Sequence, residues 1–511
     1  MKKLVNPILK MDYPDPDVIR VNDTFYMVST TMYFMPGCAI LRSYDLAEWE
    51  LAGYVYDKLD DTPAERLELE KTEYGGGMWA PSFRYHKGKF YIFFLSHSGN
   101  TNYLFTADRI EGPWKRSIVA GHYHDASLFF DDDDRAFLIY GNTEIRITEL
   151  DEKLSGPKAG GLDRVLIKDE RDVVLGYEGA HFYKIGKYYY LFVIDWPKGG
   201  MRTQSCFRGE SLEGEFTGGV VLEDSRDYCG QGVAQGGIVD TLGGKWYGVF
   251  FQDMGAVGRI PVLVPMHWEE DFPLFGEDGK VPNRLELVSS RPNYIYEALY
   301  TSDDFIPKEG LPKESQLALP WQWNHQPDNG LWRLLPEGGL EITTDKLCIN
   351  LVHARNILTQ RMLWPRCSAE VTINAEGLHD GDTAGLCALQ CCYGMIGITK
   401  ERDSYYLLRI VRSGEDLTDD IAKIDLFPGV VTDRLKLDGP EVCVCLKANF
   451  EDMKDRLEFY YLKGNKFVRF GAPHRMQFRL AHFTGNRFGL CCYSTRTVGG
   501  KAVFTRFIYN D

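Results

Sequence analysis

A five-fold repeat in the first half of the chain limits what this sequence can fold into. Each copy joins a short turn to an aromatic-rich strand, and the copies occupy residues 22–26, 87–91, 133–137, 185–189 and 243–247. Several short strands that recur at a fixed phase are typical of a β-propeller, in which each copy forms one blade. The sequence therefore predicts an all-β chain that begins with a five-bladed propeller.

A second feature lies eleven or twelve residues before the last aromatic residue of each copy. The five positions hold Asp15, Trp79, Asp125, Glu178 and Gln235. Residues of equal phase on the innermost strands of a propeller converge on one central funnel. Three carboxylates that meet there cannot all ionise freely, and proteins keep such clusters mainly where the shifted proton is used. Aspartate is also common in turns, but three acids at one phase favour a functional cluster.

The charge of the chain excludes some classes of partner. The formal net charge is −15, which disfavours nucleic acid and anionic membranes, because both are bound through basic surfaces. A neutral sugar meets no such repulsion, and the aromatic content of 13% suits stacking against sugar rings. The start of the chain lacks the apolar segment of a signal peptide, and no run reaches transmembrane length. We therefore expect a cytoplasmic protein with no membrane or nucleic-acid partner.

The composition changes after the repeats. Residues 1–302 form the expected propeller, and residues 303–318, rich in Asp, Pro, Lys and Glu, are typical of a linker. Alternating strands follow without the blade repeat, so residues 319–511 are expected to form a β-sandwich. Most of the 12 cysteines lie in this part, without zinc-ligand spacing. They are interpreted as buried apolar residues in a reducing compartment.

Paired carboxylates suggest a specific chemistry. Glycoside hydrolysis needs one protonated carboxyl that donates to the leaving oxygen and a second, ionised carboxylate. A third can keep the acid protonated and oriented. Residue types alone also allow a hard-metal site, which takes oxygen ligands, or a carbohydrate-binding funnel without catalysis.

Several short motifs, taken in their order along the chain, resemble those of a known enzyme family and favour the glycoside hydrolase over the metal site and the binding funnel. YPDPD at 13–17, GMWAPS at 77–82, DASLFFD at 125–131, YEGAH at 177–181 and GR at 258–259 resemble glycoside hydrolase family 43. WQWNH at 321–325, ARNILTQR at 354–361 and DTAGL at 382–386 resemble the β-sandwich attached to the β-xylosidases of that family. This resemblance implies a five-bladed propeller, a concanavalin- or laminin-G-like jelly roll, and hydrolysis that inverts the anomeric carbon.

The resemblance also assigns roles to the residues that match. Asp15 would be the general base that activates water, Glu178 the general acid, and Asp125 the residue that tunes the acidity of Glu178 and orients it. The expected substrate-binding residues are Arg259, Trp79, Phe34 and Gln235. Family members commonly carry a histidine where Gln235 stands, often near a calcium ion or a structural water. Gln235 offers only a carbonyl oxygen, so we expect no required cofactor and no metal ligands, with an axial calcium left open.

The predicted substrate is an oligosaccharide that ends in a pentose. The first choice is an exo-acting β-D-xylosidase, and the alternative is an α-L-arabinofuranosidase or a bifunctional enzyme. A carbohydrate-binding propeller is the non-enzymatic alternative. A related five-bladed enzyme acting on fructosides is disfavoured because 14–18 reads PDPDV instead of its opening motif. The sequence leaves the oligomeric state open, including a homo-oligomer.

Overall fold

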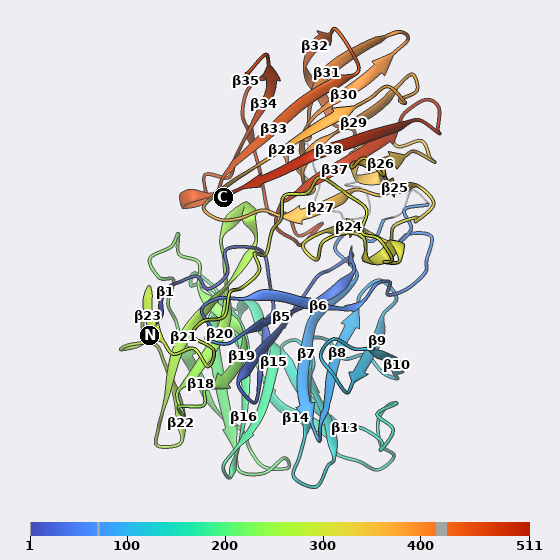
Figure 1. Ribbon diagram of the computed structural model, residues 1–511. Coiled ribbons are helices and arrows are strands. Elements are labelled where there is room, and N and C mark those ends of the chain that lie inside the picture. Colours follow the sequence, from blue (N-terminus) through green and yellow to red (C-terminus); the bar gives the residue numbers. More distant parts are fainter. Residues whose placement is uncertain (1, 69–71, 415–426) are drawn as a thin grey trace.

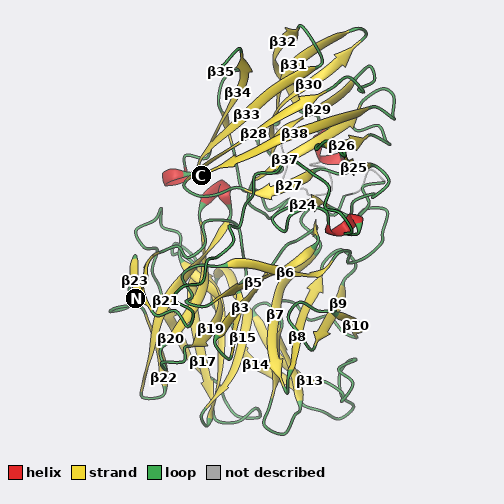
Figure 2. Cartoon of the chain, viewed as in Figure 1, coloured by secondary structure: helices red, strands yellow, loops and turns green. Residues whose placement is uncertain are grey.

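Two β domains make up the chain in the computed structural model, which describes residues 2–68, 72–414 and 427–511. The propeller runs from blue to green in Figure 1, and the sandwich from yellow to red. Helices are almost absent (Figure 2): the described residues form only the short 3-10 turns η1 (Gly255–Val257), η2 (Lys313–Ser315), η3 (Leu351–His353) and η4 (Glu451–Met453). Within this described part, no helix is long and apolar enough to cross a membrane.

The propeller has five blades, each a four-stranded sheet whose strands follow one another along the chain. Blade 1 consists of β2 (Asp17–Val21), β3 (Thr24–Ser29), β5 (Gly37–Ser43) and β6 (Glu50–Tyr56). Blade 2 consists of β7 (Met78–His86), β8 (Lys89–Ser96), β9 (Thr101–Ala107) and β10 (Lys115–Val119). Blade 3 is β11 (Ser127–Phe130), β12 (Ala136–Tyr140), β13 (Glu144–Glu149) and β14 (Asp163–Lys168). Blade 4 consists of β15 (Val173–Ile185), β16 (Tyr188–Pro197), β17 (Thr203–Gly209) and β18 (Thr217–Leu222). Blade 5 consists of β19 (Val233–Asp240), β20 (Trp246–Asp253), β21 (Arg259–Glu269) and β22 (Phe272–Phe275).

The second strand of each blade explains the aromatic repeat. β8 and β20 are continuous apolar runs that are buried along most of their length. Neighbouring blades cover both faces of such a strand, so its apolar residues do not alternate with polar ones. The ring closes where the amide of Gly237 in blade 5 donates to the carbonyl of Pro16 in blade 1, at 3.1 Å. Outside the ring, β1 (Lys2–Val5) pairs with β23 (Arg284–Leu287).

Strand pairing corrects the predicted phase of two residues. The innermost strands align on pairs of Asp17 with Val28, Ser82 with Phe93, Ser127 with Ile139, His181 with Phe192, and Gly237 with Val249. Two residues before these positions, every blade has a positive φ, at Asp15 (52°), Ala80 (31°), Asp125 (46°), Gly179 (64°) and Gln235 (59°). Asp15, Asp125 and Gln235 therefore occupy equivalent positions in their blades, as the repeat predicted. The predicted phase is off by one residue for Trp79 and Glu178, each of which directly precedes the positive-φ residue of its blade.

The sandwich consists of two eight-stranded sheets, and its strand order matches a predicted β-sandwich rather than further blades. One sheet contains β24 (Gln322–Asn324), β27 (Leu358–Arg361), β29 (Asp382–Leu389), β30 (Gly394–Glu401), β31 (Ser404–Val411), β32 (Val430–Leu437) and β37 (Arg487–Ser494). The other contains β25 (Trp332–Leu334), β26 (Leu340–Thr343), β28 (Arg366–Asn374), β33 (Glu441–Asn449), β34 (Arg456–Lys463), β35 (Lys466–Arg469) and β38 (Lys501–Asn510), with β36 (His474–Arg475) beside β34.

The two domains share a sheet. The propeller strand β4 (Phe34–Met35) pairs with β24 and completes the first sandwich sheet as its eighth strand. The predicted linker is also anchored, because Asp303 and Phe507 exchange backbone hydrogen bonds and Phe305 is buried. The cysteines are all buried except Cys229, which is exposed, and Cys443, which is half-buried.

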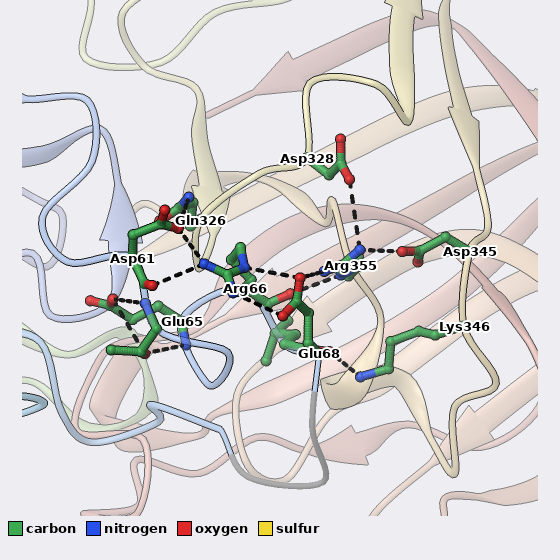
Figure 3. A network of polar contacts seen from close by, with 11 residues as sticks. Asp61, Glu65, Arg66, Glu68, Gln326, Asp328, Asp345, Lys346 and Arg355 are labelled. Carbon is green, nitrogen blue, oxygen red and sulfur yellow. Dashed lines mark hydrogen bonds and ion pairs between the residues drawn. The ribbon is translucent and has the colours of Figure 1, made fainter.

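A polar network holds the loop between blades 1 and 2 against the sandwich (Figure 3). Arg355 of the sandwich pairs with Glu68 at 3.1 Å and with Asp345, and its Nε donates to the carbonyl of Arg66 at 2.8 Å. Gln326 donates to Asp61 at 3.0 Å. These contacts, together with the shared sheet, fix the sandwich beside the mouth of the propeller.

Candidate active site

The three predicted carboxylates come from three blades. Asp15 precedes β2, Asp125 precedes β11, and Glu178 lies on β15. Asp15 and Asp125 are 7% and 9% exposed, and Glu178 is half-buried. The charges of Glu178 and Asp15 both act on the pKa of Asp125, so the three groups share one electrostatic environment. The propeller thus brings the predicted triad together.

Asp15 is held by two donors. Arg259 donates to its Oδ1 at 2.9 Å, and the hydroxyl of Thr30 donates to its Oδ2 at 2.7 Å. The Thr30 hydroxyl in turn accepts from the amide of Ala80 in blade 2, at 2.8 Å. Both oxygens of Asp15 therefore act as acceptors, which is the state a general base needs. Thr30 was not predicted, although it stands directly after the end of β3.

Asp125 has the properties of a group that holds a proton. Burial raises its pKa to about 7, with the charge of His124 opposing that rise and the charges of Glu178 and Asp15 adding to it. A carboxyl that titrates near neutrality changes the charge beside Glu178 within the working pH range.

Glu178 contacts two residues of the neighbouring blade. Nδ2 of Asn142 donates to its Oε2 at 2.5 Å, and Nε2 of His124 lies 3.5 Å from the same oxygen and 3.8 Å from Oδ2 of Asp125. Burial alone would lower the pKa of His124, but Asp125 and Glu178 outweigh it and raise this pKa to about 9. His124 is therefore an imidazolium at neutral pH, placed between the two acids. The sequence analysis missed both residues, although His124 directly precedes Asp125 in the sequence.

Arg259 lies beside Asp15 and has partners from both domains. Its guanidinium carbon lies 5.3 Å from the ring centre of Phe251 and 4.4 Å from that of Phe483, a residue of the sandwich. Its Nε and Nη2 are buried and lack a protein partner among the described residues. These two donors are left without an acceptor, which is costly because a buried polar group needs a hydrogen bond. No sequence signal pointed to Phe483.

Asp12 anchors the sandwich segment that carries Phe483. Its Oδ1 accepts from the amide of Arg259 at 2.8 Å, and its Oδ2 accepts from the amide of Gly485 at 2.8 Å and from the hydroxyl of Thr484 at 3.1 Å. One buried carboxylate thus links blade 1, blade 5 and the sandwich behind the active site.

A second arginine was not predicted. Arg202 pairs with Asp253, and its guanidinium carbon lies 5.0 Å from the ring centre of Trp196. Burial, and then the charge of Arg259, lowers its pKa to about 10. Arg202 therefore remains a cation near neutral pH, and its charge acts on both Glu178 and Asp15.

The predicted aromatic residues have different surroundings. The half-buried ring of Trp79 lies 4.0 Å from His97 and 5.0 Å from Phe483, centre to centre. Burial, and then His124, lowers the pKa of His97 to about 4, so this partner is a neutral ring. Phe34 is 1% exposed, and the guanidinium of Arg487 covers one of its faces at 3.4 Å. It belongs to the interdomain core, while Trp79 remains available at the site.

Gln235 packs against Gly179, the residue that follows Glu178: a Cβ atom at Gly179 would come within 2.8 Å of the glutamine side chain. The backbone amide of Gln235 donates to Oε1 of Gln204 at 2.7 Å. Among the described residues, the group of three metal-capable side chains is His124, Asp125 and Glu178. It does not surround Gln235. Within the group, Nε2 of His124 lies 3.5 Å from Oε2 of Glu178, and Nδ2 of Asn142 donates to that same oxygen.

Comparisons with known proteins agree with this geometry. Residues 4–273 match the model of glycosyl hydrolases family 43, and residues 313–510 match the beta xylosidase C-terminal concanavalin A-like domain. A beta-xylosidase of Formosa agariphila is 25% identical over 99% of this chain and 90% of its own length. A non-reducing end alpha-L-arabinofuranosidase of Bacteroides ovatus is 27% identical over 75% of this chain and 73% of its own.

A solved structure supports the fold over the full length. It is described as a bifunctional GH43-CE of Bacteroides eggerthii, and it superposes on 100% of this chain with a TM-score of 0.91 and 38% identity. This chain spans 64% of that longer one. With a family match over more than half of its residues and three carboxylates gathered from three blades, the chain belongs to glycosyl hydrolases family 43 and is a glycoside hydrolase.

Proposed function

We propose that this glycoside hydrolase is an inverting exo-enzyme that releases a terminal pentose from oligosaccharides derived from xylan or arabinoxylan. The observation that carries the proposal is the contrast between its two principal acids. Both oxygens of Asp15 accept hydrogen bonds from Arg259 and Thr30, whereas Glu178 faces the second acid, Asp125. One side of the site is built to accept a proton and the other to donate one.

The reaction follows from this division. Asp15 takes a proton from a water molecule as that water attacks the anomeric carbon. Glu178 gives its proton to the glycosidic oxygen, the bond between this oxygen and the anomeric carbon breaks, and the aglycone leaves as an alcohol. Because water attacks from the face opposite the leaving group, the configuration inverts. Exchange with solvent returns one proton to Glu178 and removes one from Asp15.

Neighbouring charges support the two roles. Arg259 pairs directly with Asp15, with 2.9 Å between Nη1 and Oδ1. Asp125, with a pKa of about 7, changes charge beside Glu178 as the pH rises through neutrality. The unpartnered Nε and Nη2 of Arg259 would bind hydroxyls of the terminal sugar.

The terminal sugar is proposed from the relatives. One relative that covers nearly all of both chains is named a beta-xylosidase, and another is named a xylosidase/arabinosidase, so β-D-xylose is the first choice. The second is α-L-arabinofuranose, because a relative with an arabinofuranosidase name matches most of the chain. Calcium is not proposed as a requirement.

A direct comparison tests this proposal. Purified protein is assayed on 4-nitrophenyl β-D-xyloside and 4-nitrophenyl α-L-arabinofuranoside, with Glu178→Ala as the control. We expect release of nitrophenol from at least one substrate and strong loss in the control. Equal rates for the wild type and the control, or silence on both substrates and on xylo- and arabino-oligosaccharides, would reject the proposal.

A further inference from the structure

Asn142 lies in the turn between β12 and β13 of blade 3, yet it contacts the acid of blade 4. Its Nδ2 donates to Oε2 of Glu178 at 2.5 Å. The hydroxyl of Thr143 donates to Oδ1 of Asn142 at 2.9 Å, which fixes the amide oxygen away from Glu178 and leaves the NH2 group facing it. The turn thus presents a hydrogen-bond donor to the general acid.

The backbone holds this turn on both sides. The amide of Gly141 donates to the carbonyl of His124 at 3.0 Å, and the amide of Thr143 donates to the carbonyl of Tyr177 at 2.8 Å. Tyr177 directly precedes Glu178, so the turn is tied to the strand that carries the acid. Both Asn142 and Thr143 are exposed, so the contact does not arise from core packing.

The chemistry of a carboxyl group gives this contact a consequence. An amide N–H can only donate a hydrogen bond, so the oxygen that it contacts must accept it. Nε2 of His124 lies 3.5 Å from the same Oε2, and an imidazolium is also only a donor. A neutral carboxyl carries one proton, which must then lie on the other oxygen, Oε1.

We propose that Asn142 is a positioning residue that keeps Oε2 of Glu178 as an acceptor and thereby places the transferable proton on Oε1. His124 lies near the same oxygen, with its Nε2 3.5 Å from Oε2 of Glu178 and 3.8 Å from Oδ2 of Asp125. The proton that leaves with the aglycone is then held in one orientation before the substrate arrives. This inference rests on the proposed role of Glu178 as the general acid.

The first test uses kinetics on aryl glycosides with good and poor leaving groups. Asn142→Ala should lose roughly 10- to 100-fold in kcat on the poor leaving group and only a few-fold on the good one, with little change in KM. Thr143→Val, which frees the amide to turn, should show a smaller loss of the same kind. Asn510→Ala, an exposed asparagine of the sandwich, is the matched control and should behave as the wild type.

The pH profile gives a readout that a purely structural role would not move. Without the Asn142 donor, the ionised form of Glu178 loses a stabilising hydrogen bond, so the alkaline limb of kcat/KM should move to higher pH. Asn142→Asp should move it further, because a second negative charge is added. An unchanged limb, equal loss on both leaving groups, or an effect on KM alone would overturn the proposal.

A measurement without turnover separates this inference from the proposed function. The carboxyl carbon of Glu178 is followed by NMR in protein labelled with ¹³C-glutamate, with Glu178→Gln used to assign the signal. Its titration midpoint should be higher in Asn142→Ala than in the wild type, whichever substrate the enzyme prefers. Identical midpoints would overturn the inference even if the wild type is a pentosidase. A shifted midpoint in a protein without pentosidase activity would instead reject only the proposed function.

Discussion

The ring of Phe483 lies over the guanidinium of Arg259, with 4.4 Å between the guanidinium carbon and the ring centre. Phe483 belongs to the sandwich and Arg259 to blade 5, so the active site contains residues of both domains. Asp12 fixes this arrangement, because it binds the amides of both Arg259 and Gly485. The sandwich therefore contributes a side chain to the candidate active site and is not only an attached module.

Removing this ring should weaken binding more than chemistry. A cation–π contact contributes about 0.5–2 kcal/mol, so Phe483→Ala should lower kcat/KM roughly tenfold, mainly through KM. Leu480→Ala, an exposed residue of the same segment, is the control. Steady-state kinetics decide: a variant with unchanged KM would show that Phe483 does not form part of the sugar site.

Thr30 offers a test of how the base is oriented. Thr30→Val keeps the shape of the side chain but removes the hydroxyl that bridges Asp15 and Ala80. We expect kcat to fall roughly tenfold, equally for good and poor leaving groups, because the base acts on water and not on the aglycone. Thr31→Val is the matched control, since the Thr31 hydroxyl accepts from the amide of Cys38 and does not contact Asp15. Activity equal to the wild type in Thr30→Val would mean that Arg259 alone orients the base.

Metal removal should leave the enzyme active. Gln235 provides no carboxylate on the axis, and the acid cluster is already engaged by Asn142 and His124. Activity after dialysis against EDTA is therefore expected to equal the untreated rate. A loss that added Ca²⁺ restores would contradict this assignment and would point to a metal site that the side chains do not reveal.

The stability of the domain interface should decrease as the pH rises. Burial raises the pKa of Glu65 to about 7, in spite of a hydrogen bond from the amide of Thr62. A glutamate in the unfolded chain has a pKa of about 4.3. The stabilisation that protonated Glu65 contributes to the folded state is therefore complete below that pH, and it is lost as the pH rises to about 7. Glu65→Gln should therefore be more stable than the wild type at pH 8, by about 1–3 kcal/mol, and equal to it near pH 4.

Urea unfolding at the two pH values measures this difference. Glu68→Gln is the comparison, because Glu68 lies in the same loop but is exposed and paired with Arg66 and Arg355. Its pKa is lowered, mainly by the hydrogen bond from Arg66, so its replacement should not stabilise the protein at pH 8. A Glu65→Gln variant that is less stable than the wild type at pH 8 would show that the carboxylate is ionised and paired there.

Local sequence signals account for the parts of the site that were predicted. Asp15, Asp125 and Glu178 could be proposed from the sequence because a propeller repeats its strands. Carboxylates that recur near the same point of the repeat stand out from the rest of the chain. The one-residue error at Glu178 became visible only in the pairing of β15 with β16, which a single strand does not reveal. Likewise, the pairing of β4 with β24 joins segments that are far apart in the sequence.

The missed residues show what kind of information was lacking. Asn142 and Thr30 follow second strands of their blades, so an inspection of those loops could have proposed them. Phe483 reaches the site only through the docking of the sandwich, which depends on Asp12 and on the shared sheet. Phe34 was expected to stack against the sugar, but its ring is buried and is covered by Arg487.

The central claim is that Glu178 donates and Asp15 accepts the proton, and one comparison tests it most directly. The kcat/KM values of Glu178→Gln and Asp15→Asn are measured on aryl pentosides with leaving groups of increasing pKa. We predict that Glu178→Gln loses most activity on poor leaving groups and much less on activated ones, whereas Asp15→Asn loses activity equally on all. Equal losses in both variants across the series, or the reverse pattern, would contradict the assignment of the two roles.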